Sequence, residues 1–447
     1  MSLSADPIHV FRRFTHLMPR HWQRRRGSLG PSHVVLSLMM MSVLGCQGYE
    51  RTITEMKKEL GDALGWDPHA DTPSAAALCQ ARRKLSTKNC TDLVSQVYDL
   101  CTSARTCASV GYGGFRLLAL DGTQLALPAY AAFKKHFGCP SNQGQKELSC
   151  PQASLLLLWD VGANQPVAWD VGPYRTAEKT QANLLAEVIG PGDLVLGDRN
   201  FPSRRFLTLA YHRKAHVLMR ARTDQMALHA FADFFASGEN DKIVEIESRN
   251  EHGRIDPAMP TIRIRLIRSR RDGSADHVYV TTLCDQDQHP AAALIELYHH
   301  RWRIETAFRE LKLWHGLERF HARHVAGIAQ EIAAMMIFQL LASELAAQVK
   351  MQHAAKEEHE NQREKSNNTT APAVSVDTIR FNRRIVADCT ISLIKAAAAN
   401  RNIKEAFDDA MQRIWRYKQK VRPGRSFTRI RKSAQRGWRN ESNKKKT

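Results

Sequence analysis

The sequence predicts an α/β protein with a mixed-sheet core, an inserted antiparallel β subdomain, and helical regions at both ends. Strand-like apolar runs alternate with amphipathic helical segments between residues 115 and 222. Apolar and polar residues then alternate at period two in stretches between 242 and 283, which is typical of half-buried strands. The chain has 447 residues, 43% of them apolar, which is enough for two or three domains with buried cores.

The first 105 residues are predicted to be helical and to form a small basic domain. Within them, TPSAAALCQARRKL (72–85) opens with Thr72-Pro73, a helix-start signal, and becomes basic towards its end. In a chain with an excess of positive charge, we expect Arg82 and Arg83 to contact nucleic acid. The alternative is a basic cluster that serves only solubility.

The predicted core begins with an apolar strand, FRLLALD (115–121), which ends in an acid. SLLLLWDVGANQPVAWDVG (154–172) predicts a hairpin of two strands about a Gly-Ala-Asn turn. The chain then predicts a helix, a short buried strand, a second helix and a fifth strand, at 176–189, 194–198, 202–215 and 216–222. The order is therefore strand, strand, strand, helix, strand, helix, strand.

Beyond residue 222 the pattern changes three times. Period-two stretches predict a separate antiparallel β segment, helices resume near Pro290, and a polar stretch without periodicity predicts a flexible linker before a last helical pair. The predicted divisions are a helical DNA-binding domain, the first part of the core, a β insertion, the second part of the core, a linker, and C-terminal helices with a basic tail: 1–105, 106–222, 223–285, 286–350, 351–374 and 375–447.

Charge points to a polyanionic partner. The chain has 65 Lys and Arg against 45 Asp and Glu, a formal charge of +20, and such an excess favours nucleic acid or an anionic membrane surface. Basic residues gather at the two ends: residues 11–26 hold six Arg and no acid, and residues 411–447 hold 14 Lys or Arg and one acid. DNA-contacting arms around a globular core are expected.

A membrane surface is the less favoured of these two partners. No apolar run approaches the ~20 residues that span a bilayer, and no helix with a large apolar face accompanies the charge. The first residues contain no secretory signal. Nine cysteines, none as Cys-x-x-Cys, are typical of reduced thiols in a cytoplasmic protein.

The stretch YHHRWRIETAFRELKLWHG (298–316) combines high charge with aromatic residues. On one continuous helix at about 100° per residue, Tyr298, Arg301, Glu305 and Lys312 share a narrow stripe, and a second polar face lies almost opposite. Two polar faces are one more than a surface helix needs. An Arg301–Glu305 ion pair is the structural alternative, but it leaves Tyr298 and Lys312 unexplained.

Two further acids complete a predicted metal site. Asp121 and Asp198 each end an apolar strand, so in neighbouring strands their carboxylates project from the same region, and Glu305 comes from a helix packed alongside. Three carboxylates repel one another unless cations neutralise them, and oxygen ligands of this kind suit Mg²⁺, with Mn²⁺ as a substitute. Two such ions about 4 Å apart activate an oxygen nucleophile for attack on phosphorus. Two other strand acids, Asp160 and Asp170, are expected to be structural. Asp193 lies about 16 Å from Asp198 along an extended strand, so both cannot serve one site, and Asp198 is preferred because it stands at the exit of the strand.

The spacing Tyr298-x₂-Arg301-x₃-Glu305-x₆-Lys312 matches the Tyr-Arg-Glu-Lys signature of bacterial insertion-sequence transposases, and the chain resembles that family. Asp121-Gly122, Asp198-Arg199-x-Phe201 and FGCPSNQGQ…PQAS (137–154) are also similar to family segments. The resemblance implies a ribonuclease-H-like core with an inserted β segment and a DDE metal-binding triad of Asp121, Asp198 and Glu305.

The same resemblance implies that Tyr298, Arg301 and Lys312 contact DNA near the cleaved end. It also implies binding to terminal inverted repeats, a homodimeric synaptic complex, and joining of 3′ ends to target DNA. Residues 199–300 contain no Trp to stack a flipped base during hairpin formation, as some relatives do. Trp302 or an aromatic of the insertion, Phe231, Phe234 or Tyr279, is the substitute.

Two rival functions remain open at this stage. A metal-dependent nuclease or resolvase on the same core would hydrolyse DNA without joining it. A DNA-binding regulator without catalysis would keep the basic regions alone.

Overall fold

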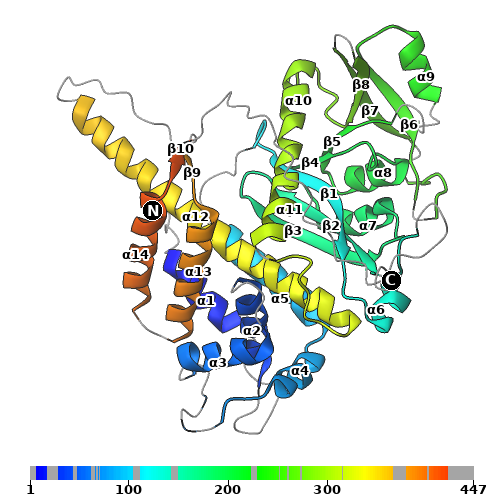
Figure 1. Ribbon diagram of the computed structural model, residues 1–447. Helices are drawn as coiled ribbons and strands as arrows, with labels where there is room; N and C mark the ends of the chain where they lie inside the picture. The colour runs from blue at the N-terminus through cyan, green and yellow to red at the C-terminus, as the bar shows by residue number, and fades with distance from the viewer. Residues whose placement is uncertain are drawn as a thin grey trace, which may run out of the picture.

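The computed structural model describes residues 7–17, 29–43, 48–61, 66, 69, 71–103, 111–141, 150–222, 229–250, 252–258, 261–271, 274–314, 316–365, 379–399 and 402–420. An eight-stranded mixed sheet and its covering helices form one part of the molecule, and a bundle of helices from both ends of the chain forms the other (Figure 1). The basic tail, the N-terminal arginines beyond Leu17 and residues 142–149 lie outside the described residues.

The core sheet starts with a three-stranded antiparallel meander. β1 (Arg116–Ala126), β2 (Gln152–Asp160) and β3 (Gln165–Pro173) pair in that order, with a short helix α6 (Ala131–Phe137) between the first two. Two strands then add in parallel on the other side of β1: β4 (Asp193–Gly197) and β5 (His216–Arg220). The order β3-β2-β1-β4-β5 is a ribonuclease-H-like arrangement, so the predicted fold class is confirmed. Along the chain, α6 is an addition to the predicted order of strands and helices.

Both faces of this sheet are covered, which explains why its strands are continuous apolar runs. Successive side chains of β1 point to opposite faces. Leu117 and Ala119 join a large cluster with the later helices α11 (Trp302–Trp314) and α12 (Val325–Lys365), and Leu118 and Leu120 join a second cluster. The helices of the second cluster are α7 (Glu178–Leu185), followed by a 3-10 turn (Ala186–Val188), and α8 (Arg204–His212).

The predicted antiparallel β segment is present, and it continues the main sheet. β6 (Asp241–Glu247), β7 (Thr261–Arg271) and β8 (Ser274–Thr281) extend the main sheet, because β8 pairs antiparallel with β5. A short helix, α9 (His229–Ala236), precedes them. Period-two alternation describes the strands correctly, but it carries no information about the strand with which each one pairs.

The chain returns to the core through α10 (Ala291–Tyr298), a 3-10 turn η2 (His299–Arg301) and α11 (Trp302–Trp314). The helix α12 (Val325–Lys365) follows and crosses the molecule (Figure 1). Because α12 continues to Lys365, the predicted flexible linker at 351–374 is helical over its first part, and residues 366–378 lie outside the described residues.

Part of α12, Val325–Ala354, is long and apolar enough to cross a membrane. We did not expect such a segment from the sequence. In the structure, 89% of its apolar window is buried inside the protein, which is typical of a core helix.

Helices from both termini surround α12. The N-terminal group is α1 (Pro7–Leu17), α2 (Pro31–Val43), α3 (Tyr49–Leu60), α4 (Ala75–Lys84) and α5 (Thr87–Ser103). The C-terminal group is α13 (Arg383–Ala398) and α14 (Ile403–Arg416), with a two-stranded ladder of β9 (Ile379–Arg380) and β10 (Gln419–Lys420). α4 begins later than expected, because Ser74 is its N-cap and accepts a hydrogen bond from the Ala77 amide at 3.2 Å.

Candidate active site

Asp121 and Asp198 lie on neighbouring strands at matching positions. The parallel pairing of β1 and β4 runs up to Leu120 opposite Gly197, and each aspartate is the next residue of its strand. The sequence predicted that the first strand ends at Asp121. In the structure β1 continues to Ala126, because it stays paired with β2. Because β4 ends here, β1 has no parallel neighbour beyond Leu120, and the two aspartates lie where this pairing stops.

Backbone hydrogen bonds hold both aspartates. The Gly122 amide donates to Asp121 Oδ1 at 2.9 Å. The Asn200 amide donates to Asp198 Oδ1 at 2.7 Å, within a tight turn that is anchored by the buried ring of Phe201. Both carboxylates keep a second oxygen for other partners.

Glu305 reaches the site from α11, which packs against β1. Residues 298–316 are not one continuous helix, because η2 tightens the backbone between α10 and α11. The common stripe drawn on an ideal helix is therefore altered, yet η2 lies against β1 and β4. This contact places Arg301 beside the aspartates.

Arg301 joins two of the three acids. Its Nη1 lies 3.3 Å from Asp121 Oδ2 and its Nη2 lies 2.9 Å from Glu305 Oε1. Arg301 is only 8% exposed, and its Nε has no acceptor among the described residues. The structural alternative, an Arg301–Glu305 ion pair, is thus present, but it extends to Asp121 and holds the acids together.

The pKa of Asp121 reports how close the acids are. This pKa is raised to about 6, chiefly by burial and also by the negative charges of Asp198 and Glu305, against the opposing effects of the Gly122 amide and Arg301. The three carboxylates therefore share one electrostatic environment.

A divalent cation fits the chemistry of these acids. Asp121 Oδ2 and Glu305 Oε1 both face one guanidinium, so a cation already compensates their charge, and carboxylate oxygens are the ligands that Mg²⁺ and Mn²⁺ prefer. Among the described residues, no group of three or more His, Cys, Asp or Glu is close enough to hold a metal ion as it stands. Arg301 would have to yield its position to a bound metal.

Two aromatic residues frame Arg301. Tyr298 is 7% exposed, and its ring meets that of Tyr279 at 5.0 Å. Burial raises the pKa of Tyr298 to about 12, so the phenol stays neutral and can donate a hydrogen bond. Trp302 is 57% exposed, with the Arg301 guanidinium 5.1 Å from its ring centre. Trp302 therefore offers an open ring face at the edge of the site.

Lys312 lies on the same side of the molecule, at the far end of β1. Its Nζ donates to the Gln124 carbonyl at 3.0 Å and lies 3.1 Å from Glu318 Oε1. The ammonium is partly exposed. A DNA contact of Lys312 stays a prediction, and it requires the lysine to exchange Glu318 for a phosphate.

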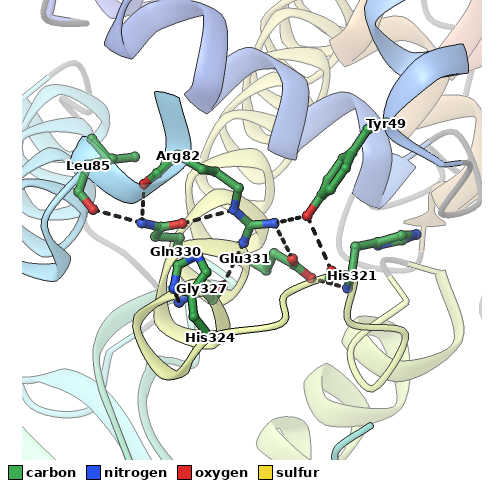
Figure 2. A network of polar contacts seen from close by, with 8 residues as sticks. All are labelled: Tyr49, Arg82, Leu85, His321, His324, Gly327, Gln330 and Glu331. Atoms are coloured by element: carbon green, nitrogen blue, oxygen red, sulfur yellow. Dashed lines mark hydrogen bonds and ion pairs between the residues drawn. The ribbon is translucent and has the colours of Figure 1, made fainter. Parts of the chain in front are cut away.

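The predicted DNA contact of Arg82 is wrong in this structure. Arg82 is 1% exposed and lies inside a polar network between α4, α3 and α12 (Figure 2). Its Nη1 is 2.8 Å from Glu331 and also donates to the Tyr49 hydroxyl, its Nε donates to Gln330, and its Nη2 donates to the Gly327 carbonyl. Each guanidinium nitrogen thus has a protein acceptor, and at 1% exposure the group is inaccessible to a phosphate.

Arg83 differs from Arg82, although it is the next residue. The Arg83 side chain is exposed, because neighbouring helical positions point about 100° apart. Its DNA contact stays a prediction.

The two strand acids that were expected to be structural, and the alternative acid Asp193, have structural partners. Asp160 Oδ1 accepts from the Ala163 amide at 2.7 Å and caps the hairpin turn. Asp170 accepts from Gln181 at 2.8 Å, and Asp193 pairs with Arg116 at 2.8 Å. None of them lies in the group around Arg301.

Sequence reasoning missed one acid at the site. Glu178, the first residue of α7, lies beside Asp198: burial raises its pKa, the charge of Asp198 raises it further, and a hydrogen bond from the Asn200 side chain opposes both. Its position in the first turn of a helix is a common one for Glu, so the sequence offered no signal that set it apart.

Comparison with known proteins fits this arrangement. A sequence profile described as the transposase DDE domain matches residues 112–341, which are 230 of the 447 residues and include Asp121, Asp198 and Glu305. The chain belongs to the DDE transposase domain family.

The family assignment is supported by a relative of known name. Over 242 residues, the chain is 23% identical to the transposase InsG for insertion sequence element IS4 of Escherichia coli (strain K12). The match covers 53% of this chain and 52% of InsG, so the chain spans about half the length of the curated relative that it matches. Among solved structures, it is similar to a piggyBac transposase synaptic complex with hairpin DNA, with 11% identity, a TM-score of 0.43, and coverage of 94% of this chain and 87% of that chain.

Proposed function

We propose that this DDE transposase binds the terminal inverted repeats of its own insertion sequence, cleaves the element ends and transfers their 3′ ends to target DNA. The observation that carries the proposal is the group of Asp121, Asp198 and Glu305 around Arg301, inside the segment that matches the family. We further propose that Tyr298, Arg301, Glu305 and Lys312 act as the Tyr-Arg-Glu-Lys signature of insertion-sequence transposases.

In this proposal the three acids hold Mg²⁺, for which Mn²⁺ substitutes. When bound, the metal supplies activation of a water or a 3′-hydroxyl and stabilisation of the leaving oxygen. The residues of the chain bind and orient the DNA. Arg301, released from the carboxylates, has three donors for a phosphate near the cleaved bond, and its Nε already lacks an acceptor.

The exposed residues near the site give the DNA its other contacts. Trp302 presents an open ring on which a base can stack, and Lys312 provides a point charge for the strand backbone. Of the insertion aromatics, Phe231, Phe234 and Tyr279 are each 2% exposed or less. Trp302 is therefore the better candidate for a flipped base.

The protein is proposed to act in the cytoplasm as a homodimer that pairs two DNA ends. Its charge of +20 favours a polyanion, and most of its long apolar helix is buried by the protein itself. Arg83 and the tail 421–447 are proposed to add sequence-independent phosphate contacts.

A cleavage-and-joining assay tests the proposal. It uses the full chain, a donor DNA with the element's own ends, a target DNA and Mg²⁺. Asp198→Asn removes a proposed ligand, and Asp233→Asn, at an exposed position on α9, is the matched control. We expect excised and joined products from the natural protein and the control, and none from Asp198→Asn.

Two results would replace the proposal with another function. Cutting without joining would favour a nuclease or resolvase on the same core. Specific binding without cutting, under any divalent metal, would favour a regulator.

A further inference from the structure

Glu178 is the acid at the site that the proposed triad does not use. It begins α7, which covers the face of the sheet opposite α11. Glu178 and Glu305 therefore approach the end of β4 from opposite faces of the sheet. The helix cap before it, Ala177, provides no side-chain hydrogen bond. Among the described residues, no Lys, Arg or His forms an ion pair with Glu178, and no cation is among the groups that shift its pKa.

A short chain of hydrogen bonds links Glu178 to Asp198. The Asn200 side chain lowers the pKa of Glu178 as a hydrogen-bond donor to its carboxylate, and the Asn200 amide donates to Asp198 Oδ1 at 2.7 Å. One residue therefore joins the two acids through its side chain and its backbone. The orientation of the Asp198 carboxylate depends on where Asn200 is held.

Gly122 is the second contact of Glu178. A Cβ atom built on Gly122 would lie 2.7 Å from Glu178 Oε1 and 3.3 Å from the carboxyl carbon. Real Cβ atoms do not approach an oxygen so closely, so the carboxylate occupies the space that a side chain at this position would need. The position of the Glu178 carboxylate is therefore sensitive to the side chain of the residue after Asp121.

We propose that Glu178 is a positioning residue of the active site: through Asn200 it fixes the Asp198 carboxylate for cation binding, and it adds an uncompensated negative charge behind it. This inference rests on the proposed metal-dependent function. Residues that orient metal ligands in this way typically contribute 10- to 100-fold to metal affinity or activity.

The first test measures metal binding without DNA or catalysis. Mn²⁺ is titrated calorimetrically into the metal-free full chain, and thermal unfolding in chelator checks that each variant is folded. We expect Glu178→Ala to bind Mn²⁺ about tenfold more weakly than the natural protein. Glu178→Gln keeps an acceptor for Asn200 and is expected to recover part of that loss. Glu187→Gln, at an exposed site in the following 3-10 turn, is the matched control and should bind normally.

The second test moves the Glu178 carboxylate without changing any acid. Gly122→Ala puts a methyl group against Glu178 Oε1 and should displace that flexible carboxylate, which reproduces the weaker Mn²⁺ binding. In a double-mutant cycle with Glu178→Ala, the two losses should fail to add, because the second change has nothing left to displace.

The outcomes separate this inference from the function on which it rests. If Asp198→Asn leaves Mn²⁺ binding unchanged, the metal site itself is wrong. If Asp198→Asn abolishes binding while Glu178→Ala stays within about twofold of the natural protein, only the role of Glu178 is wrong. A Gln variant as weak as the Ala variant would overturn the positioning role, and so would fully additive losses in the cycle.

Discussion

Arg82 and Arg301 are both buried arginines that pair with a glutamate, yet their surroundings differ in one respect. Around Arg82, all three guanidinium nitrogens have protein acceptors, and Glu331 is itself nearly inaccessible, at 6% side-chain exposure. Around Arg301, one nitrogen has no acceptor, and the partner Glu305 is 37% exposed. The first arrangement is closed to solvent and each guanidinium nitrogen has an acceptor, whereas the second is open and its guanidinium has capacity left for a ligand.

The comparison teaches how to separate structural from functional charge. A completed buried network resists change, because removing one member leaves the others unpaired away from water. An incomplete one, close to solvent, can exchange its partners at small cost. Four experiments can break or sharpen this contrast.

Arg82→Ala should have the largest effect, and it should be on stability. The change leaves Glu331 buried without its cation, which typically costs about 3–5 kcal/mol of unfolding free energy. Chemical denaturation of the full chain measures this loss. If Arg82→Ala unfolds at the same denaturant concentration as the natural protein, the closed network is not a structural one. Arg83→Ala is the matched control, because its side chain is exposed.

Arg301→Ala should act on the reaction more than on the fold. We expect end cleavage to fall by about 10²-fold, because a charged donor near the reacting phosphate is lost. The stability should change much less than for Arg82→Ala, since Glu305 can turn to water. The cleavage assay and the same denaturation experiment are run side by side. If Arg301→Ala lost much stability while its folded fraction cleaved DNA normally, Arg301 would have a structural role like that of Arg82.

Acidity should act on the metal-free site through Asp121. The pKa of this carboxyl is raised to about 6, chiefly by burial, so the folded state takes up a proton more readily than the unfolded state. Its contribution to stability is therefore unfavourable above pH 6 and is relieved as pH falls towards the ordinary value near 4, by roughly 1–3 kcal/mol.

Asp121→Asn should remove this contribution. Thermal unfolding in chelator at pH 7 and pH 5 gives the comparison: the natural protein should gain stability on acidification relative to the variant. An equal pH dependence of both proteins would show that Asp121 titrates normally.

Arg83→Ala should have the smallest effect. Stability should stay within about 0.5 kcal/mol, as for most surface changes. If Arg83 contacts a phosphate, binding to non-specific DNA should weaken, and the slope of log affinity against log salt should decrease by about 1. An unchanged slope would leave Arg83 as a solubility residue.

Much of the molecule could be predicted from the sequence, because the signals are local. Apolar runs gave the core strands, and period-two alternation gave β6, β7 and β8. The candidate site residues Asp121, Asp198 and Glu305 were predicted from acids that follow apolar runs and from the spacing of 298–316, although β1 continues past Asp121 and η2 interrupts the helix. Spacing along the chain is sufficient for this, since side-chain direction follows directly from the period of each element.

The tertiary structure decided what depends on contacts between distant segments. Only the pairing of β8 with β5 shows that the insertion extends the main sheet, and only packing on α12 turns Arg82 from a surface cation into a buried one. The contact between Glu178 and Gly122 likewise joins residues that are far apart in the chain, one before and one after the β2–β3 hairpin. Such contacts are set by how whole elements meet, and burial then determines which charges must be paired within the protein. A local pattern therefore identifies the acids and the cations, and the fold determines which of them remain available to DNA and metal.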